Sequence, residues 1–398
     1  MTLHKDAAAP AAHTGPLPWA KLRSAPAGPQ AFKRMIDAID PRAKPGDMVA
    51  VYDKNGAPYG VGFYNPNSLI TLRILGREAA GADSEAFFAA RLDQAIRFRR
   101  EQLKLDETTD AYRLVHDYGD GMPGLVIDRY ADVFVLEFYS LGMFRQAARL
   151  ERLLLQRFPG SRVVRRASEY TQKMEGFDLK PGPELRVRVR ENGVAFEVMP
   201  SGGYKTGFFC DQRDNRLAAA GLAAGRRVLD VCSYTGGFGI YAKVKGGADE
   251  VTCVELDPDA SEAAKKNANI NQARVKVVTV DAFPFLRQAA ANSERFGLVV
   301  LDPYKLIASR EGYAEGRQKY IDFNRLALAV VEEGGFFVTC SCSGMLSAPE
   351  FQDFVRSAAG SAGRRVQIFR RSGAGPDHPF AVDYPEGEYL KALWCRVF

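Results

Sequence analysis

From about residue 226 onward, short apolar runs alternate with stretches whose apolar residues have helical spacing. The apolar runs predict strands at residues 228–231, 250–254, 275–280, 298–301 and 336–340. Strands that alternate with helices in this way form a mostly parallel sheet with helices on both faces. We therefore expect a doubly wound α/β domain, in which ligands bind beyond the carboxyl ends of the strands.

The first three predicted strands end on residues suited to a nucleoside. The first contains Asp230 and leads into a loop with Gly236 and Gly237, before a helix. Glycines let the main chain approach a ligand closely, and a helix N-terminus offers N–H donors. The second strand ends on Glu255, whose carboxylate could accept both hydroxyls of a ribose. The third ends at Asp281-Ala282, where an adenine edge would lie.

The dinucleotide fingerprint GxGxxG is not present at this loop, so a nucleoside without a pyrophosphate is the better prediction. Taken singly, a Gly-Gly pair is common in turns, and an aspartate after a strand often caps a helix. The loop glycines are followed in order by Glu255, Asp281 and Asp302, each at a strand end. This order favours a ligand site over the separate structural roles.

The fourth and fifth predicted strands bring a carboxylate and a thiol to the same edge of the sheet. The run LVVLDPYK ends on Asp302, and the run FFVTCSCSG ends on Cys342. This pair indicates covalent chemistry on an electrophilic ring or carbonyl. Cys340, two residues earlier, is expected to pack in the core, which is also the usual role of a cysteine taken at random.

The first half of the chain has a different texture, in which apolar and polar residues alternate between turn signals. From Gly46, turns at 54–56 and 65–68 separate strand-like runs and predict a small β-barrel. Helical spacing follows at 83–105, β-structure at 112–139 and a hairpin at 186–198. The expected segments are a flexible leader at 1–30, a barrel at 31–80, a central α+β domain at 81–198 and the doubly wound domain at 199–398.

Composition bounds the partners and the compartment. The chain has 46% apolar and 26% charged residues and a net charge of +6, which permits a nucleic-acid partner without establishing one. Six cysteines without CxxC spacing and four scattered histidines make a metal site unexpected. Reduced cysteines, no bilayer-length apolar run and no signal peptide predict a cytoplasmic protein without a membrane partner.

The motifs VLDVCSYTGGFG, VELD, VDAFPFL, LDPYK and GGFFVTCSCSG, in this order, resemble those of class I S-adenosylmethionine-dependent methyltransferases. More narrowly, the chain is similar to the ribosomal RNA large subunit methyltransferase I family, 5-methylcytosine enzymes with an N-terminal PUA domain. The stretches YKTGFFCDQRDNR, YRLVHDYGDGMPGLVIDRYAD and GFYNPNSLITLRIL also match that family, so the resemblance runs from about Gly46 to the C-terminus. It implies a PUA barrel, a mostly β central domain and a C-terminal Rossmann-like methyltransferase domain.

The resemblance also implies a cofactor, a partner and roles for single residues. S-adenosylmethionine is the expected cofactor, and RNA from the large ribosomal subunit is the expected partner. Whether the protein is also a homodimer is left undecided. Cys342 lies seven residues after Gly335, as in similar enzymes whose cysteine adds to carbon 6 of cytosine, and Asp302 would bind the base. The residues expected to hold the methyl donor are Asp230, Tyr234, Thr235, Gly236, Gly237, Glu255, Asp281, Ala282 and Asp302.

Two departures from related patterns affect this interpretation. Where the family commonly has Asp-Pro-Pro-Lys, this chain has Tyr304, which could stack on a target base or crowd the pocket. Other RNA cytosine-C5 enzymes carry a cysteine after the proline of this motif, and here there is none, so the base that removes the C5 proton is unassigned. The candidate RNA contacts near the site are Lys205, Arg213, Tyr304 and Lys305, and Arg216 is a further cationic candidate for RNA phosphates.

Arginines elsewhere in the chain could also contact RNA. Arg186, Arg188 and Arg190 alternate along one predicted strand, which puts three guanidinium groups on one face. Two other functions remain open from the sequence. One is methylation of a nitrogen, for example on guanine, for which Cys342 would not be needed. The other is an inactive RNA-binding or ribosome-assembly factor with the same fold.

Overall fold

The computed structural model describes residues 9–77, 84–201 and 207–398. Contacts between residues group the chain into two compact units. The first unit contains residues 1–187, 198–208 and 376–387, and the second contains residues 188–197, 209–375 and 388–398. The chain therefore passes between the units several times, whereas the sequence suggested consecutive segments.

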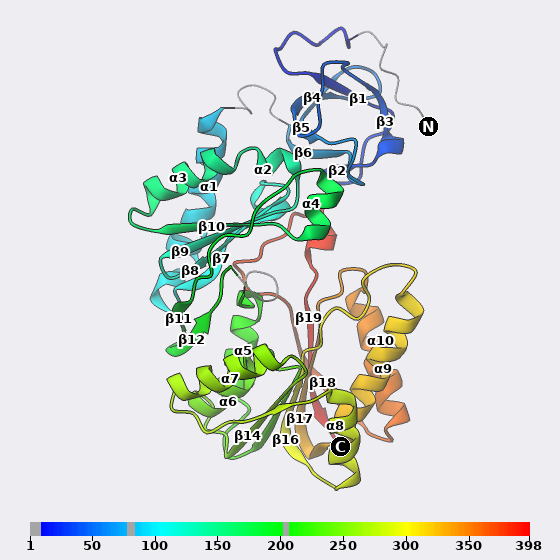
Figure 1. Cartoon of the computed structure of the whole chain (residues 1–398). Helices are drawn as coiled ribbons and strands as arrows, with labels where there is room; N and C mark the ends of the chain where they lie inside the picture. Colours follow the sequence, from blue (N-terminus) through cyan, green and yellow to red (C-terminus); the bar gives the residue numbers. More distant parts are fainter. Residues whose placement is uncertain (1–8, 78–83, 202–206) are drawn as a thin grey trace. The chain divides into compact units, whose positions relative to one another are not determined.

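The N-terminal part of the first unit is a six-stranded sheet with the order β2-β6-β5-β4-β1-β3 (Figure 1). Its strands are β1 (Trp19–Leu22), β2 (Gln30–Ala31), β3 (Ile36–Ile39), β4 (Met48–Tyr52), β5 (Pro58–Tyr64) and β6 (Leu72–Gly76). The turn expected between β4 and β5 is present, because the Asp53 carboxylate accepts hydrogen bonds from the main-chain N–H groups of Asn55 and Ala57. Gly56 completes this turn with a φ of 85°.

The segment expected as a flexible leader at 1–30 contains a folded strand. Strand β1 begins at Trp19 and pairs with both β3 and β4, and its residues Ala20 and Leu22 are fully buried. The strand has only four residues. An alternation this short, next to a region rich in alanine and proline, is too weak for a sequence pattern to reveal.

The central part of the first unit is a four-stranded sheet with the order β10-β9-β8-β7, together with four helices. The elements are α1 (Glu85–Arg97), β7 (Ala111–His116), β8 (Leu125–Tyr130), β9 (Val133–Phe138), α2 (Leu141–Phe144), α3 (Ala147–Arg157), β10 (Arg162–Arg166) and α4 (Glu169–Glu175). The predicted helix and the predicted β-region are thus confirmed. Phe63 of the barrel and Leu114 and Ile127 of the central sheet belong to one apolar core, so these two parts are packed as one body.

One buried carboxylate connects the barrel to the central part. Glu175, at the end of α4, is 3% exposed and accepts hydrogen bonds from Arg73 Nη2 (2.9 Å), Asn65 Nδ2 (2.9 Å) and the Leu141 N–H (3.0 Å). Burial alone would raise the pKa of Glu175, but the Arg73 guanidinium and the hydrogen bonds outweigh it and lower the pKa. The side chain is therefore a charged centre on which several elements depend.

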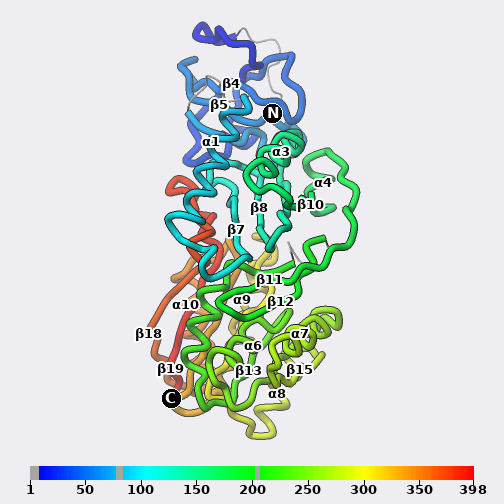
Figure 2. Tube along the Cα trace, turned by 90° about the vertical axis from the view of Figure 1, so that its left-hand side faces the viewer, coloured from blue at the N-terminus to red at the C-terminus, as the bar shows by residue number. Residues whose placement is uncertain are grey.

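The second unit contains a seven-stranded sheet with the order β15-β14-β13-β16-β17-β19-β18. The strands are β13 (Arg227–Val231), β14 (Glu250–Glu255), β15 (Lys276–Thr279), β16 (Phe296–Leu301), β17 (Val331–Ser341), β18 (Val366–Ser372) and β19 (Lys391–Val397). The first five strands in this order pair in parallel, while β19 pairs antiparallel with both β17 and β18. The predicted doubly wound sheet is confirmed, and Figure 2 shows β18 and β19 side by side near the C-terminus.

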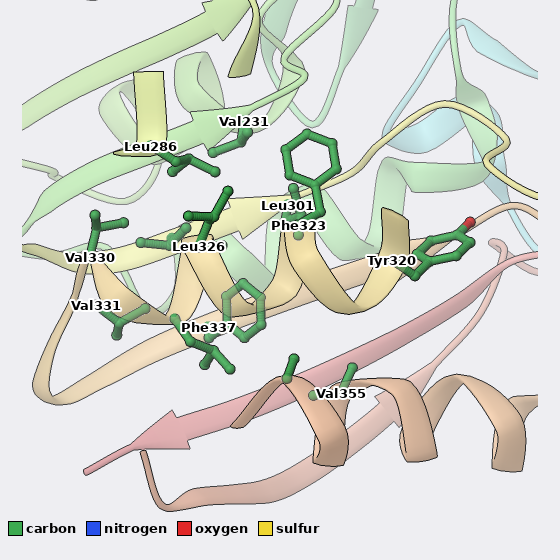
Figure 3. Close-up of a cluster of buried hydrophobic side chains, with 14 of the residues drawn as sticks. Val231, Leu286, Leu301, Tyr320, Phe323, Leu326, Val330, Val331, Phe337 and Val355 are labelled. Carbon is green, nitrogen blue, oxygen red and sulfur yellow. The ribbon is translucent and has the colours of Figure 1, made fainter. Parts of the chain in front are cut away.

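Helices cover both faces of this sheet. They are α5 (Arg213–Ala220), α6 (Gly237–Val244), α7 (Pro258–Ile270), α8 (Ala282–Ala291), α9 (Tyr313–Ala329) and α10 (Ala348–Ser361). On one face, Phe323 of α9 and Val355 of α10 pack with Phe337 of β17 (Figure 3). On the other face, residues of α6 pack with Val338 and Cys340 of β17. Because both of its faces are buried, the central strand β16 is a continuous apolar run, whereas the edge strand β15 is exposed or half-buried throughout.

The predicted hairpin before this domain is also present. It consists of β11 (Val187–Glu191) and β12 (Val194–Val198), with Asn192 and Gly193 in left-handed conformations at the turn. Arg188 and Arg190 are exposed on β11, while Val189 and Glu191 are buried, as the alternation predicts. Within the described residues, no helix combines the length and apolar character needed to cross a membrane.

Candidate active site

The site lies at the point where the strand order in the sheet of the second unit reverses, between β13 and β16. From β13 the chain continues through β14 to β15 on one side, while β16 pairs with the other side of β13 and is followed by β17. The main-chain N–H of Asp302 donates to the carbonyl of Val231, so the ends of β16 and β13 are in register. Such a reversal point leaves a crevice at the carboxyl ends of the strands, which is where ligands bind in this architecture.

The loop after β13 is held in an unusual main-chain conformation. Cys232, Tyr234 and Gly236 have φ values of 61°, 49° and 81°, although only glycine adopts such angles without strain. The Tyr234 N–H donates to Glu255 Oε2 at 2.7 Å, and the Ser233 N–H donates to the carbonyl of Val254. Strain of this kind costs about 1–3 kcal/mol for each residue and is found mainly at ligand-binding segments.

Helix α6 starts directly after this loop and lies very close to the sheet. Gly236 is its N-cap and provides no side chain to cap it, so N–H groups of the first turn face the loop. A Cβ atom on Gly239 would lie 2.4 Å from Cys253 Sγ, so only glycine fits there. The Gly239 N–H donates to Asp230 Oδ2 at 2.8 Å, which fixes the helix to β13.

Asp230 is fully buried beneath the loop, as a strand-end aspartate aimed at a ligand should be. Its second oxygen, Oδ1, has no hydrogen-bond partner among the described residues. Burial, opposed in part by the Gly239 hydrogen bond and increased by the charge of Asp302, raises the pKa of Asp230 to about 7. An acceptor with unused capacity therefore lies under the strained loop.

The next two strand ends provide two more carboxylates. Glu255 accepts from the N–H groups of Tyr234, Leu256 and Asp257, which fixes its position at the end of β14. Asp281 is exposed and accepts a hydrogen bond from the Phe283 N–H at 2.7 Å. It therefore has a structural role as the N-cap of α8, in addition to any role in binding a ligand.

Two residues lie beside these carboxylates: Leu256, which was not predicted from the sequence, and Ala282, which was predicted to hold the methyl donor. Leu256 directly follows Glu255 and is 63% exposed, which is unusual for a leucine and gives a flat apolar surface beside the carboxylate. An apolar residue after a strand-end acid is the signal that could have identified it. Ala282 is the first residue of α8 and is buried, so it can act only through its main chain.

Asp302 is held by a chain of amide side chains. Gln212 Nε2 donates to Asp302 Oδ2 at 2.9 Å, Asn215 Nδ2 donates to Gln212 Oε1 at 2.6 Å, and Ser372 Oγ donates to Asn215 Oδ1 at 2.7 Å. Gln212 and Asn215 are buried, so these bonds are shielded from water. The carboxylate of Asp302 therefore has a fixed direction before any substrate binds.

The two cysteines of β17 have different environments. Cys340 is completely buried in the core, as predicted, and burial raises the pKa of its thiol well above the ordinary value. Cys342 lies just beyond the end of β17 and is half-buried. Ser341 and Ser343, on either side of it, both hydrogen bond to the Tyr320 hydroxyl, at 2.8 and 3.0 Å. The strand end that carries Cys342 is thus fixed, while its thiol is partly open.

The predicted RNA contacts divide into three groups. Lys205 lies outside the described residues. Arg213 is buried, with a hydrogen bond from Nε to Asp214, so its side chain is not exposed to RNA phosphates in this conformation. Arg216, a further cationic candidate, forms a buried ion pair with Glu191 at 2.8 Å. Tyr304, 60% exposed, and the exposed Lys305 remain accessible after β16.

Comparisons with known proteins agree with this geometry. A model of S-adenosylmethionine-dependent methyltransferases matches residues 175–393, and a PUA-like domain model matches residues 28–77. The "Ribosomal RNA large subunit methyltransferase I" of Aliivibrio fischeri is 37% identical over 378 residues, covering 93% of this chain and 95% of that protein. The protein of the same name from Vibrio cholerae is 36% identical over 380 residues, with the same coverage. The chain belongs to the ribosomal RNA large subunit methyltransferase I family.

Solved structures share the fold of this family member. The methyltransferase SMU.776, complexed with SAH, has a TM-score of 0.79 and 19% identity, covering 93% of this chain and 95% of its own. A SAM-dependent methyltransferase from Streptococcus mutans has a TM-score of 0.77 and 18% identity, covering 94% and 99%. At this level of identity the likeness concerns the fold alone.

The residues at the strand ends fit the S-adenosylmethionine on which this family depends. The unused Asp230 Oδ1 and the uncapped first turn of α6 offer an acceptor and donors for a polar end, as an amino acid moiety requires. Glu255 offers a carboxylate for ribose hydroxyls, and Leu256 an apolar surface for a flat base. A pyrophosphate would meet two carboxylates here, so the set suits a nucleoside without phosphates.

Proposed function

We propose that this chain methylates carbon 5 of a cytosine in large-subunit ribosomal RNA, and that Cys342 forms a transient covalent bond to the base. The observation that carries the proposal is the half-buried thiol at the end of β17, beside the strand that ends on Asp302. The names of the relatives support ribosomal RNA as the substrate. The PUA-like domain at 28–77 gives a second RNA-binding element.

The reaction requires an added nucleophile, because carbon 5 of cytosine is by itself only weakly nucleophilic. The Cys342 thiolate forms a bond to carbon 6, and the electrons of the C5–C6 double bond then make carbon 5 nucleophilic. The methyl donor supplies an electrophilic methyl group on a sulfonium. Methyl transfer would leave the donor as a neutral thioether. Carbon 5 would then lose its proton to solvent, the electrons of the C–H bond would form the double bond again, and the Cys342 thiolate would leave carbon 6.

Asp302 would direct the base toward the thiol. Its carboxylate can accept a hydrogen bond from the exocyclic amine of cytosine or from a protonated N3, which favours addition at carbon 6. Gln212 uses only part of the acceptor capacity of Asp302, since a carboxylate has about four acceptor positions. The fixed Gln212–Asn215 chain keeps this oxygen pair aimed in one direction.

Tyr304 and Lys305 are the residues proposed to hold the RNA at the mouth of the site. An aromatic side chain that is 60% exposed directly after the Asp302-Pro303 turn can stack on a base, which contributes about 1–3 kcal/mol per base. Tyr304→Ala should therefore weaken RNA binding, whereas Tyr304→Phe should retain it. Equal binding of wild type and both variants would remove Tyr304 from the proposed site.

The decisive test uses labelled S-adenosylmethionine and large-subunit ribosomal RNA. Wild-type protein should transfer label to cytosine, and Cys342→Ala should transfer none and form no covalent RNA adduct. Cys395→Ala, a buried cysteine in the middle of β19, is the matched control and should remain active. Full transfer by Cys342→Ala would point to methylation of a nitrogen, and no transfer by the wild type would point to a binding factor.

A further inference from the structure

Lys391 is a buried lysine next to the strand end that carries Cys342. It is the first residue of β19, its register partner on β17 is Ser341, and it is 6% exposed. Lysine is rarely buried to this extent without a specific reason, because removing an ammonium group from water is costly. Lys391 has no role in the predictions made from the sequence.

The ammonium group of Lys391 is fixed by two main-chain carbonyls. Nζ donates to the carbonyl oxygen of Ser343 at 2.7 Å and to that of Tyr389 at 2.9 Å. Ser343 directly follows Cys342, so the first bond holds the charge against the peptide beside the thiol. Carbonyl oxygens carry only partial charge, so these bonds do not neutralise the ammonium.

Charged and titratable groups from several neighbouring segments face this position, and Cys340 and Asp302 also lie near this strand end. Cys342 and Glu350 favour the charged form of Lys391, as does Glu388 from the segment before β19, whereas Lys305 after β16 opposes it. Burial is the largest influence, and together these effects lower the pKa of Lys391 to about 8, so the side chain is largely an ammonium at pH 7. Tyr320 of α9 also faces Cys342, and burial raises the pKa of its hydroxyl to about 12, so it stays neutral.

We propose that Lys391 is a positioning residue for methyl transfer, whose fixed ammonium group stabilises the thiolate form of Cys342. The inference rests on the proposed role of Cys342 as the nucleophile. When the thiol ionises, its proton goes to solvent and Lys391 keeps its own. The ammonium group is bonded to the carbonyl of the residue that follows Cys342, and an opposite charge close to a group typically shifts its pKa by about 1–3 units, here downward.

Alkylation of Cys342 by iodoacetamide, followed by mass spectrometry of its peptide from pH 6 to 10, measures the thiolate without any cofactor or RNA. In the wild type, the apparent pKa of Cys342 should lie below the ordinary value of about 8.5. Lys391→Met, which keeps the length and removes the charge, should slow alkylation at pH 7 by about tenfold or more, since one pKa unit is a tenfold change in thiolate. Lys391→Arg should retain most of the rate.

Lys319→Met is the control, because Lys319 is exposed on α9 and pairs with Glu315. It should alkylate like the wild type. A wild-type pKa at or above about 8.5, or equal rates for Lys391→Met and wild type, would overturn the proposal. The wild-type profile alone decides the matter if Lys391→Met fails to fold.

Methyl transfer gives a second, separate measurement. Lys391→Met should lose activity at pH 7 and recover it as the pH rises, which loss of a purely structural contact would not produce. Full activity of Cys342→Ala would refute the proposed function itself. The alkylation profile would then still show whether Lys391 acts on the thiol, so the two failures can be told apart.

Discussion

Replacing Asp230 with asparagine should change the free energy of unfolding of the ligand-free protein more favourably above pH 7 than at pH 5. The folded pKa of Asp230, raised to about 7 by burial, lies above the value of about 3.9 expected in the unfolded chain. Between these two values the folded state binds more protons than the unfolded state. The free energy of unfolding therefore falls as the pH rises, and this contribution is gone above the folded pKa.

The size of the effect follows from the two pKa values. Between pH 5 and pH 8, this one carboxyl group should remove about 2 to 3 kcal/mol from the free energy of unfolding. Asparagine does not titrate and can still accept the Gly239 hydrogen bond. Its NH2 group, however, would occupy the position of Oδ1, which has no partner among the described residues, at a cost of about 1–3 kcal/mol that does not depend on pH.

Urea unfolding of wild type and Asp230→Asn at pH 5, 6, 7 and 8 measures this directly. From pH 5 to pH 8, the free energy of unfolding of Asp230→Asn minus that of the wild type should rise by about 2 to 3 kcal/mol. Other titrating groups contribute equally to both proteins and cancel in this difference. Ser233→Ala, a neutral change in the same loop, should show a constant difference. A constant difference for Asp230→Asn would refute the reasoning, since it would mean that Asp230 is already ionised at pH 5.

Three further changes test other parts of the structure. Glu175→Ala leaves the Arg73 guanidinium buried without its carboxylate and should lower the free energy of unfolding by about 3–5 kcal/mol, while Glu175→Gln should lower it less. Gly239→Ala places a Cβ atom against Cys253 Sγ and should cost about 1–3 kcal/mol, measured by the same urea titration, and reduce binding of the methyl donor in calorimetry. Asp302→Asn should lower kcat by about 10²–10⁴-fold in the labelled transfer assay, with little change in stability; an unchanged kcat would exclude Asp302 from the reaction.

The parallel strands were predictable because both of their faces are buried. Residues 298–301 form a continuous apolar run that stops at Asp302, and such runs remain visible in a single sequence. Strand β18 was missed because it carries little apolar signal: most of its residues are exposed or half-buried, and Arg370 and Arg371 lie within it. Its partner β19 was missed as well, although its sequence KALWCRV is a mostly buried apolar run of the kind that predicts a strand.

The roles of individual charged residues were harder to predict for the same reason. Arg216 was expected to be available to RNA, but Glu191 on the preceding hairpin neutralises it inside the fold. The partner lies 25 residues away along the chain, so nothing near Arg216 in the sequence reveals it. Lys391 was overlooked because its carbonyl acceptors at Ser343 and Tyr389 become visible only when the strands are paired.

The position of β19 affects how the protein can be made in the cell. This strand follows β17 and β18 in the chain, yet it lies between them rather than at an edge of the sheet. The growing chain therefore cannot complete this sheet until β19 has been synthesised. Until then, β17 exposes a row of unpaired main-chain groups, which can pair with other chains. Because Lys391 lies on β19, Cys342 would gain its charged neighbour only when β19 pairs with β17, so chains that end before β19 would lack the proposed activated thiol.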